Sequence, residues 1–208
     1  MKLSSSIIQS TLRLGLFAAL TAVILGATYV YTKPFIEEQI ALAERKSFDE
    51  VLLPSLYDND LMASTVSRPD WLARVTNDDG PIHIATNNGR LQALVFRTDS
   101  LQGYSGRISL IVAIDPDLTV LGTRVISHRE TPGLGDKIEL RKSDWILGFN
   151  DQSFDSDNLE RWDVTKYQGD FDQFTGATIT PRAVVRQLRS TLNVISTHPE
   201  WIEELGNE

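Results

Sequence analysis

The chain has 208 residues, a length that suits one ordinary domain with an appendage. Its first 33 residues hold three of the 20 basic side chains and none of the 28 acids, which leaves 17 basic residues against 28 acids downstream, a net charge of −11. That acidity argues against nucleic acid as a partner and against an electrostatic hold on anionic lipid. Cysteine is absent, which excludes disulfides, iron–sulfur clusters, thiolate zinc sites and cysteine nucleophiles together.

A run of eighteen residues without a charge extends from Leu14 to Tyr31. At about 1.5 Å per residue a helix of this run spans roughly 27 Å, close to the hydrocarbon thickness of a bilayer. Tyr29 and Tyr31 lie at one end, where amphipathic rings prefer the interface, and Lys33 closes the run. Residues 1–33 are therefore predicted to form a tail and a single membrane anchor. A cleaved signal peptide is the alternative, but its apolar region is normally shorter and followed directly by a small-residue cleavage site.

The charges around this run do not decide its orientation. Lys2 and Arg13 precede it, whereas Lys33, Arg45 and Lys46 follow within range. Neither flank therefore has the clear excess of basic residues that marks the cytoplasmic side of a span.

Residues 34–80 are predicted to form a stalk helix and a connecting segment. The helix, Pro34 to Leu53, continues the anchor, and its apolar side chains recur near one face. Residues 54–80 are polar and rich in turn formers, and no element is assigned to them. The apolar positions of the helix are Phe35, Ile36, Ile40, Ala43, Phe48 and Val51 or Leu52.

From residue 82 the pattern is that of β-strands, in a main domain spanning residues 81–208. The turn Asn87-Asn88-Gly89 predicts a hairpin, and Asp115 to Asp117 predicts the turn between two core strands. An antiparallel sheet with covering helices, and hence an α+β fold, follows from this block of strands and the helical periods after it. The predicted strands are Ile82–Ala85, Leu91–Phe96, Arg107–Ile114 and Thr119–Ser127, and the predicted helices are Leu140–Phe149 and one containing Val184, Val185, Leu188, Leu192 and Ile195.

The most informative segment is Asp172-Gln173-Phe174-Thr175-Gly176-Ala177-Thr178. It places an acid, two hydroxyls and two minimal side chains ahead of a helix start, with Thr180 as the predicted N-cap and Pro181 as the first helical residue. The unpaired N–H groups and the dipole of that first turn favour a phosphate. The two small residues before Thr178 leave room for one.

This segment resembles the flavinylation motif of the FMN-binding domain family, an acid, two free positions, Ser or Thr, Gly, Ala, then Ser or Thr. The resemblance implies that Thr178 is esterified to the phosphate of FMN by a dedicated flavin transferase. It makes Asp172, Thr175, Gly176 and Ala177 the other cofactor-site residues of the motif. An ordinary turn before a helix is the alternative for Thr-Gly-Ala-Thr alone.

A second motif, Glu130-Thr131-Pro132-Gly133-Leu134-Gly135, follows the last predicted strand. Its two glycines let the backbone approach a flat ligand closely, and its proline stiffens the entry. A tight surface loop has the same composition. The motif resembles the loop of the FMN-binding family that packs against the isoalloxazine ring, which implies contacts from Glu130, Thr131, Gly133, Leu134 and Gly135.

Gly103-Tyr104-Ser105-Gly106 also resembles the family pattern, although a turn opening a strand explains it equally well. The three histidines, His83, His128 and His198, have no metal-ligand spacing, so no metal site is predicted, and His128 is interpreted as structural. Motifs for a nicotinamide-binding enzyme or a serine hydrolase are absent.

Anchor, stalk and the three motifs occur in the order found in the G subunits of Rnf-type electron transport complexes, called Rsx in some bacteria. The resemblance implies an inner-membrane subunit with a periplasmic domain that carries covalent FMN. It further implies electron relay, without a catalytic residue of its own, between ferredoxin and NAD in a complex that moves ions, with the other subunits as partners. The alternatives are the C subunit of a sodium-pumping NADH:quinone oxidoreductase, which is typically longer, a stand-alone flavin reductase, and a cofactor-free binding or scaffold domain.

Overall fold

The computed structural model describes the backbone of residues 2–207 and the side chains of residues 9–35 and 46–206. The chain divides into two compact units, Met1–Glu44 and Arg45–Glu208. The strands of the described residues all belong to the second unit.

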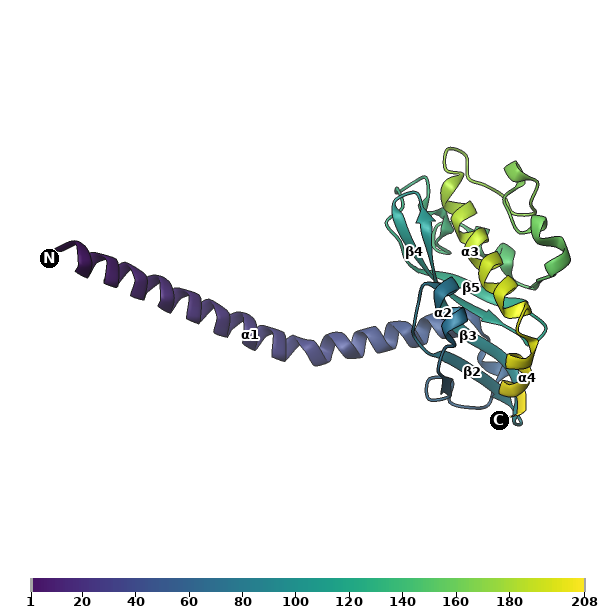
Figure 1. Ribbon diagram of the computed structural model, residues 1–208, viewed down its shortest axis with the longest axis horizontal. Coiled ribbons are helices and arrows are strands. Elements are labelled where there is room, and N and C mark those ends of the chain that lie inside the picture. The colour runs from purple at the N-terminus through teal and green to yellow at the C-terminus, as the bar shows by residue number, and fades with distance from the viewer. Residues whose placement is uncertain (1, 208) are drawn as a thin grey trace. The chain divides into compact units, whose positions relative to one another are not determined.

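Helix α1, Lys2–Val51, contains the predicted anchor (Figure 1). Its segment Gln9–Phe35 is long and apolar enough to cross a membrane, and no part of its most apolar window is buried in the protein. The hydroxyls of Thr21, Thr28 and Thr32 donate to carbonyl oxygens four residues earlier, at 2.8–2.9 Å. Their hydrogen-bonding needs are thus met within the helix, as the interior of a bilayer requires.

The segment predicted as the stalk helix, Pro34 to Leu53, lies almost wholly within α1, which continues through Pro34 and ends at Val51. Phe48, Val51 and Leu52, three of the predicted apolar positions, are buried, whereas Phe35 is exposed. The predicted positions Ile36, Ile40 and Ala43 lie outside the described side chains.

The domain is built on a six-stranded antiparallel sheet in which each strand pairs with the next along the chain. The turn Asn88-Gly89 has positive φ at both positions, 51° and 73°, which is the type I′ geometry that matches the twist of a hairpin. Asp115 accepts the N–H groups of Asp117 and Thr119 and fixes the second predicted turn. The strands are β1 Thr65–Val66, β2 Ile82–Asn87, β3 Arg90–Gly103, β4 Gly106–Ile114, β5 Thr119–Ser127 and β6 Gln152–Ser153.

Strand β3 is longer than the predicted Leu91–Phe96, because its polar second half is buried and has hydrogen-bond partners. The hydroxyl of Thr98 lies 3.2 Å from that of Thr191, and Ser100 donates to the carbonyl of Ala183 at 3.0 Å. Both partners lie in helix α3, Ile179–Ser196, so the side chains of Thr98 and Ser100 face the core rather than solvent.

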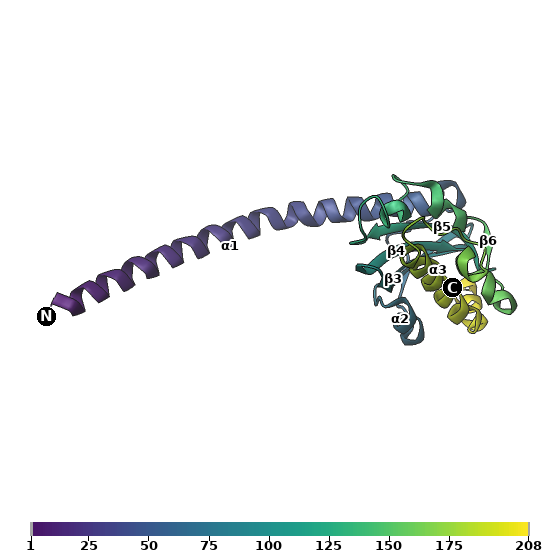
Figure 2. The ribbon, with the colours of Figure 1, turned by 90° about the horizontal axis from the view of Figure 1, so that it is seen from above.

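Both faces of the sheet are covered. Helices α2 (Asp70–Thr76), α3 (Ile179–Ser196) and α4 (Pro199–Asn207) lie on one side (Figures 1 and 2), where Leu94, Phe96 and Leu110 join the larger hydrophobic core. On the opposite face, alternate residues of β2, β3 and β4 pack against the end of α1 in a smaller core. That core consists of Phe48, Val51, Leu52, Leu61, Ala85, Ala93, Val95, Ile111 and Ala113.

The helix predicted over Leu140–Phe149 is wrong in its first half. Ser143 is extended, with φ −163° and ψ 147°, and its hydroxyl caps the backbone N–H of Trp145, so the helix begins only at Asp144. The segment left unassigned contains β1, α2 and a short 3₁₀ helix. The 3₁₀ helices are η1 Pro54–Leu56, η2 Asp136–Ile138, η3 Asp144–Phe149, η4 Ser156–Arg161 and η5 Thr165–Tyr167.

Gly122 of β5 marks a close contact between the sheet and the end of α1. A Cβ at this position would lie 2.3 Å from the carbonyl oxygen of Val51, whereas a Cβ at Gly148 would meet nothing within 4 Å. We therefore expect Gly122→Ala to lower the free energy of unfolding by about 1–3 kcal/mol, because the backbone of α1 must move to admit the methyl group. Thermal or denaturant unfolding of both variants measures the difference. A Gly122→Ala variant as stable as Gly148→Ala would contradict this packing.

Candidate cofactor site

Three segments far apart in sequence surround one cavity of about 380 Å³. They are the turn between β3 and β4, the loop after β5, and the start of α3, each of which contains one of the motifs identified in the sequence. A volume of this size falls within the range of small-molecule sites. The lining residues are Tyr104, Glu130, Thr131, Leu134, Gly135, Gly176, Ala177, Thr178, Ile179 and Thr180.

Thr178 lies at the junction between a tight turn and α3. The turn closes with a hydrogen bond of 3.0 Å from the N–H of Ala177 to the carbonyl of Phe174, and Gly176 supplies its positive φ of 82°. Thr178 is the residue before the first helical residue, and its hydroxyl makes no capping hydrogen bond. The hydroxyl is therefore not used to cap the helix and stays available at the wall of the cavity.

The predicted start of α3 is wrong by two residues. The helix begins at Ile179, so Thr178, rather than Thr180, occupies the cap position, and Pro181 is the third helical residue instead of the first. Proline is tolerated there because the N–H groups of the first turn have no intrahelical partner. The Thr180 hydroxyl donates instead to the buried carboxylate of Glu130.

Glu130 connects the three segments. Its side chain, in a residue only 4% exposed, accepts the N–H of Ser105 at 2.8 Å and the hydroxyl of Thr180. Two glycines make room for it: an added Cβ would lie 2.8 Å from its Oε1 at Gly103, and 3.0 Å from its Cβ at Gly135. The added Cβ would lie nearer still to the carbonyl oxygen of Gly106 at position 103, at 2.3 Å, and to the Thr180 hydroxyl at position 135, at 2.9 Å. Glycine is thus required at both positions by close packing around Glu130 and its neighbours.

The loop after Glu130 forms a compact turn. The carbonyl of Thr131 accepts the N–H groups of Leu134 and Gly135, at 3.2 and 3.0 Å. Gly133 has a positive φ of 78°, and its N–H donates to Asp136 at 2.8 Å. The loop also reaches the turn before α3, because a Cβ at Gly176 would lie 3.6 Å from Leu134.

Three predicted site residues do not line the cavity. Asp172 and Thr175 have exposed side chains, and Gly133 turns the loop without facing the ligand space. The backbone of Asp172 is nevertheless anchored, since its carbonyl accepts the indole N–H of Trp145 at 2.8 Å. The ring of Trp145 packs edge-on against buried Phe174, with centroids 5.2 Å apart, and thereby fixes the base of the turn.

An ion pair holds the first turns of α3. Asp163, 5% exposed, accepts hydrogen bonds from Arg182 at 2.8 and 3.0 Å and from Arg186 at 3.2 Å. Burial alone would raise the pKa of Asp163, but the hydrogen bonds from Arg182 and the Val164 N–H, with the two arginine charges, outweigh burial and lower it. The guanidinium carbon of Arg182 lies 3.2 Å from the centroid of the Tyr167 ring. The sequence contained no signal for this pairing.

The interpretation of His128 as structural is confirmed. Its Nδ1 accepts the N–H of Glu130 at 3.0 Å, and its Nε2 lies 2.7 Å from Glu139, so the ring is held as the Nε2-protonated tautomer. Hydrogen bonds from Arg141 and His128 lower the pKa of Glu139 to about 2. Across the described residues, no group of three or more His, Cys, Asp or Glu side chains is placed to hold a metal ion.

The cavity has an apolar rim and a polar end. Tyr104, Leu134 and Ile179 are 70%, 45% and 52% exposed, which leaves apolar surface for a flat aromatic ligand. The polar end is the first turn of α3, where the N–H groups of Ile179 and Thr180 precede the first intrahelical bond, from Arg182 to Thr178. These donors and the helix dipole suit a phosphate next to the Thr178 hydroxyl. The residues present therefore fit a flavin mononucleotide.

Comparison with known proteins agrees with this geometry. Residues 103–193 match the FMN-binding domain family, and residues 1–51 match the RnfG N-terminal region. The class is thus a flavin-domain protein with an N-terminal helix of membrane-spanning length. The chain belongs to the family of G subunits of ion-translocating oxidoreductase complexes, which confirms the resemblance seen in its sequence.

Two relatives illustrate the similarity. The chain is 44% identical over 202 residues to the G subunit of the ion-translocating oxidoreductase complex of Vibrio vulnificus, an alignment that covers 95% of this chain and 93% of the relative. It is 47% identical over 186 residues to the G subunit of the same complex in Cronobacter sakazakii, covering 85% of this chain and 84% of the relative.

Among solved structures, Shewanella oneidensis NqrC has a similar fold, with a TM-score of 0.51 and 23% identity over 76% of this chain and 75% of that one. The predicted α+β fold is confirmed by this likeness and by the sheet described above.

Glu130 offers a direct test of how the site is held together. Glu130→Ala would leave the buried Thr180 hydroxyl without its acceptor and would remove the hydrogen bond from the Ser105 N–H. We expect the free energy of unfolding to fall by about 1–3 kcal/mol, the cost of unsatisfied buried polar groups. Glu204→Ala, at an exposed position of α4, is the matched control. Equal stability of the two variants in denaturant titrations would contradict the role of Glu130.

Proposed function

We propose that this chain carries FMN esterified through its phosphate to the Thr178 hydroxyl, and that it relays electrons within the complex. The observation that supports this proposal is the convergence of three sequence motifs on one cavity that contains Thr178. When bound, the flavin supplies the redox chemistry. The protein contributes position and environment.

Each part of the cavity has a distinct task in this proposal. The N–H groups of Ile179 and Thr180 and the dipole of α3 stabilise the phosphate charge. The side chains of Tyr104 and Leu134 cover the flat ring, and the Glu130–Gly135 loop sets its surroundings. Thr178 is the attachment point and takes no part in electron transfer itself.

Covalent attachment has a physical rationale if the domain is periplasmic, as we propose. Free FMN is made in the cytoplasm, so a cofactor lost outside could not readily be replaced. We further propose a dedicated flavin transferase as the maturation partner, the inner membrane as the location, and the coupling of ferredoxin and NAD redox chemistry to ion movement as the activity of the complex.

The attachment residue can be tested by mass. Thr178→Val should abolish flavin that survives denaturation while leaving the fold intact, because the change removes the hydroxyl and keeps the shape. Thr175→Val, an exposed position in the same turn, should weaken attachment less. Intact mass and flavin fluorescence of the denatured subunit, co-expressed with the transferase, measure both effects. A peptide map placing the adduct on Thr175 or Thr180 would rule out the assignment, and a wild-type chain without any adduct would favour a cofactor-free scaffold.

The side of the membrane is a separate question. A reporter active only in the periplasm, fused after Glu208, should be active, because the family resemblance implies a periplasmic domain and the chain offers one candidate span among the described residues. A reporter active only in the cytoplasm, fused at the same point, serves as the control. Activity of the cytoplasmic reporter would refute the periplasmic assignment.

A further inference from the structure

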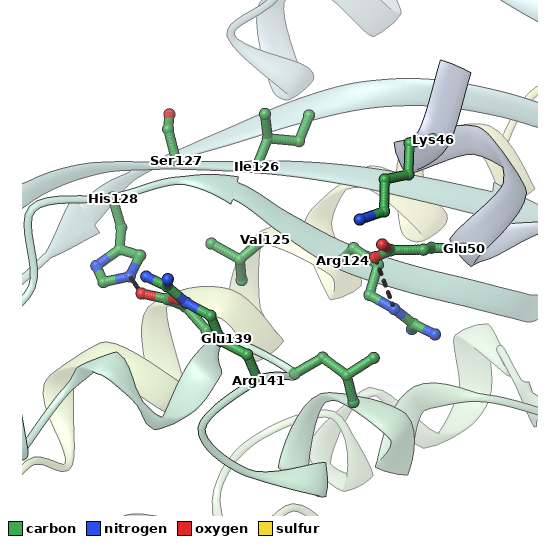
Figure 3. A pocket seen from close by; sticks show the side chains of 10 residues that line it. Lys46, Glu50, Arg124, Val125, Ile126, Ser127, His128, Glu139 and Arg141 are labelled. Carbon is green, nitrogen blue, oxygen red and sulfur yellow. Dashed lines mark hydrogen bonds and ion pairs between the residues drawn. The ribbon is translucent and has the colours of Figure 1, made fainter. Parts of the chain in front are cut away.

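A second cavity, of about 690 Å³, lies beside the sheet and is separate from the proposed flavin site (Figure 3). Three segments form its walls: the second half of β5, the end of α1, and the residues that follow η2. We call it the β5 groove. Its lining residues are Lys46, Glu50, Arg124, Val125, Ile126, Ser127, His128, Glu139, Leu140 and Arg141.

One wall of the β5 groove is an open strand edge. Strand β5 pairs with β4 in regular register from Gly122 to Val125, with a register shift on either side of this stretch, and it pairs with β6 only at Thr119 and Val120. Within the described part of the chain, residues 121–127 therefore have a strand neighbour on one side alone. An exposed edge of this kind presents unpaired N–H and C=O groups to any further strand.

The backbone groups at this edge can be assigned. The carbonyl of Thr123 accepts Nη1 of Arg124 at 2.7 Å, and the Arg124 side chain lines the groove, so this carbonyl points away from β4. Alternate residues of an antiparallel strand direct their N–H and C=O groups to the same side. Val125 therefore presents both of its backbone groups to the groove.

The charges of the β5 groove are gathered at its two ends (Figure 3). Lys46, Glu50 and Arg124 lie at one end, and His128, Glu139 and Arg141 at the other. At the second end the carboxylate of Glu139 is already hydrogen-bonded by both of its neighbours. Val125 lies between the two ends in Figure 3, and the apolar residues of the lining are Val125, Ile126 and Leu140.

At the end formed by Lys46, Glu50 and Arg124, one side-chain nitrogen lacks a hydrogen-bond acceptor. The Arg124 side chain is 13% exposed, and its Nε, 3.8 Å from Glu50, has no hydrogen-bond partner among the described residues. Burial lowers the pKa of Arg124, an effect that the charge of Glu50 offsets in part. Lys46 is exposed at the same end and adds a second cation. A buried guanidinium nitrogen without an acceptor is costly, so this end suits an incoming carboxylate.

We propose that the β5 groove binds an extended segment of another subunit of the complex. The segment pairs with the open edge of β5 at Val125 and places a carboxylate between Arg124 and Lys46. Strand addition of this kind takes affinity from main-chain hydrogen bonds and specificity from side-chain pockets. The proposal rests on membership of a subunit family and does not require covalent flavin.

The absence of native cysteine permits a direct footprint of the groove. Ser127→Cys places one thiol at the open edge, and Arg90→Cys places one at an exposed position of the β2–β3 hairpin. Both full-length variants should react with maleimide when isolated in detergent. In the purified complex the Ser127→Cys thiol should lose its reactivity, whereas Arg90→Cys should keep it. Full labelling of Ser127→Cys in the complex would overturn the proposal.

A charge reversal tests the chemistry of the occupant. Lys46→Glu should cause loss of the subunit from the affinity-purified complex, whereas Lys166→Glu, at another exposed position, should not. The melting temperature of each isolated variant should match that of the wild type. Retention of the Lys46→Glu subunit would overturn the carboxylate assignment. Protection of Ser127→Cys in vesicles that hold this subunit alone would show that the groove faces lipid, and would also overturn the proposal.

Discussion

The cavity depends on one buried carboxylate. Glu130 accepts hydrogen bonds from the β3–β4 turn and from the first turn of α3, so it fixes two segments against its own loop. A carboxylate that is 4% exposed is tolerated in a protein interior only when such donors surround it. Positions 103 and 135 are glycine because a larger residue would collide with this side chain and, more closely still, with the Gly106 carbonyl or the Thr180 hydroxyl. The shape of the site thus follows from the need to satisfy one charge.

The sequence is sufficient to predict those parts of the fold that follow from a local pattern of residues. Strand alternation and the Asn88-Gly89 turn predicted the central hairpins, and β5 was predicted with its observed limits. The polar stretch Thr98 to Ser100 was not predicted as strand, because its partners lie in a helix more than 80 residues away. The hydrophobic periodicity of a segment does not show that one of its polar residues has a buried partner elsewhere in the chain. The same reason explains the shortened helix before Phe149, where one extended serine ends the pattern.

For the candidate site, the sequence motifs identified most of the residues that line the cavity. They did not identify the ion pair that holds α3 in place. Eight of the ten lining residues lie in the three sequence motifs, and the two others, Ile179 and Thr180, follow Thr178 directly. Motifs identify lining residues because the residues that form a motif are those that contact a ligand. The ion pair of Asp163 with α3 leaves no such mark, since aspartate and arginine are common on any surface.

Strand β5 fixes the distance between the end of α1 and the Glu130 loop. At Gly122 it is in direct contact with the last turn of α1, and a few residues later it leads into the Glu130 loop. A strand advances about 3.3 Å per residue and does not stretch, so the five steps from Gly122 to Ser127, which include one register shift against β4, span at most roughly 17 Å. The cavity lined by Glu130 lies beyond the end of this strand. A flavin held there would keep a constant distance from that helix end, and electron transfer rates depend steeply on such distances.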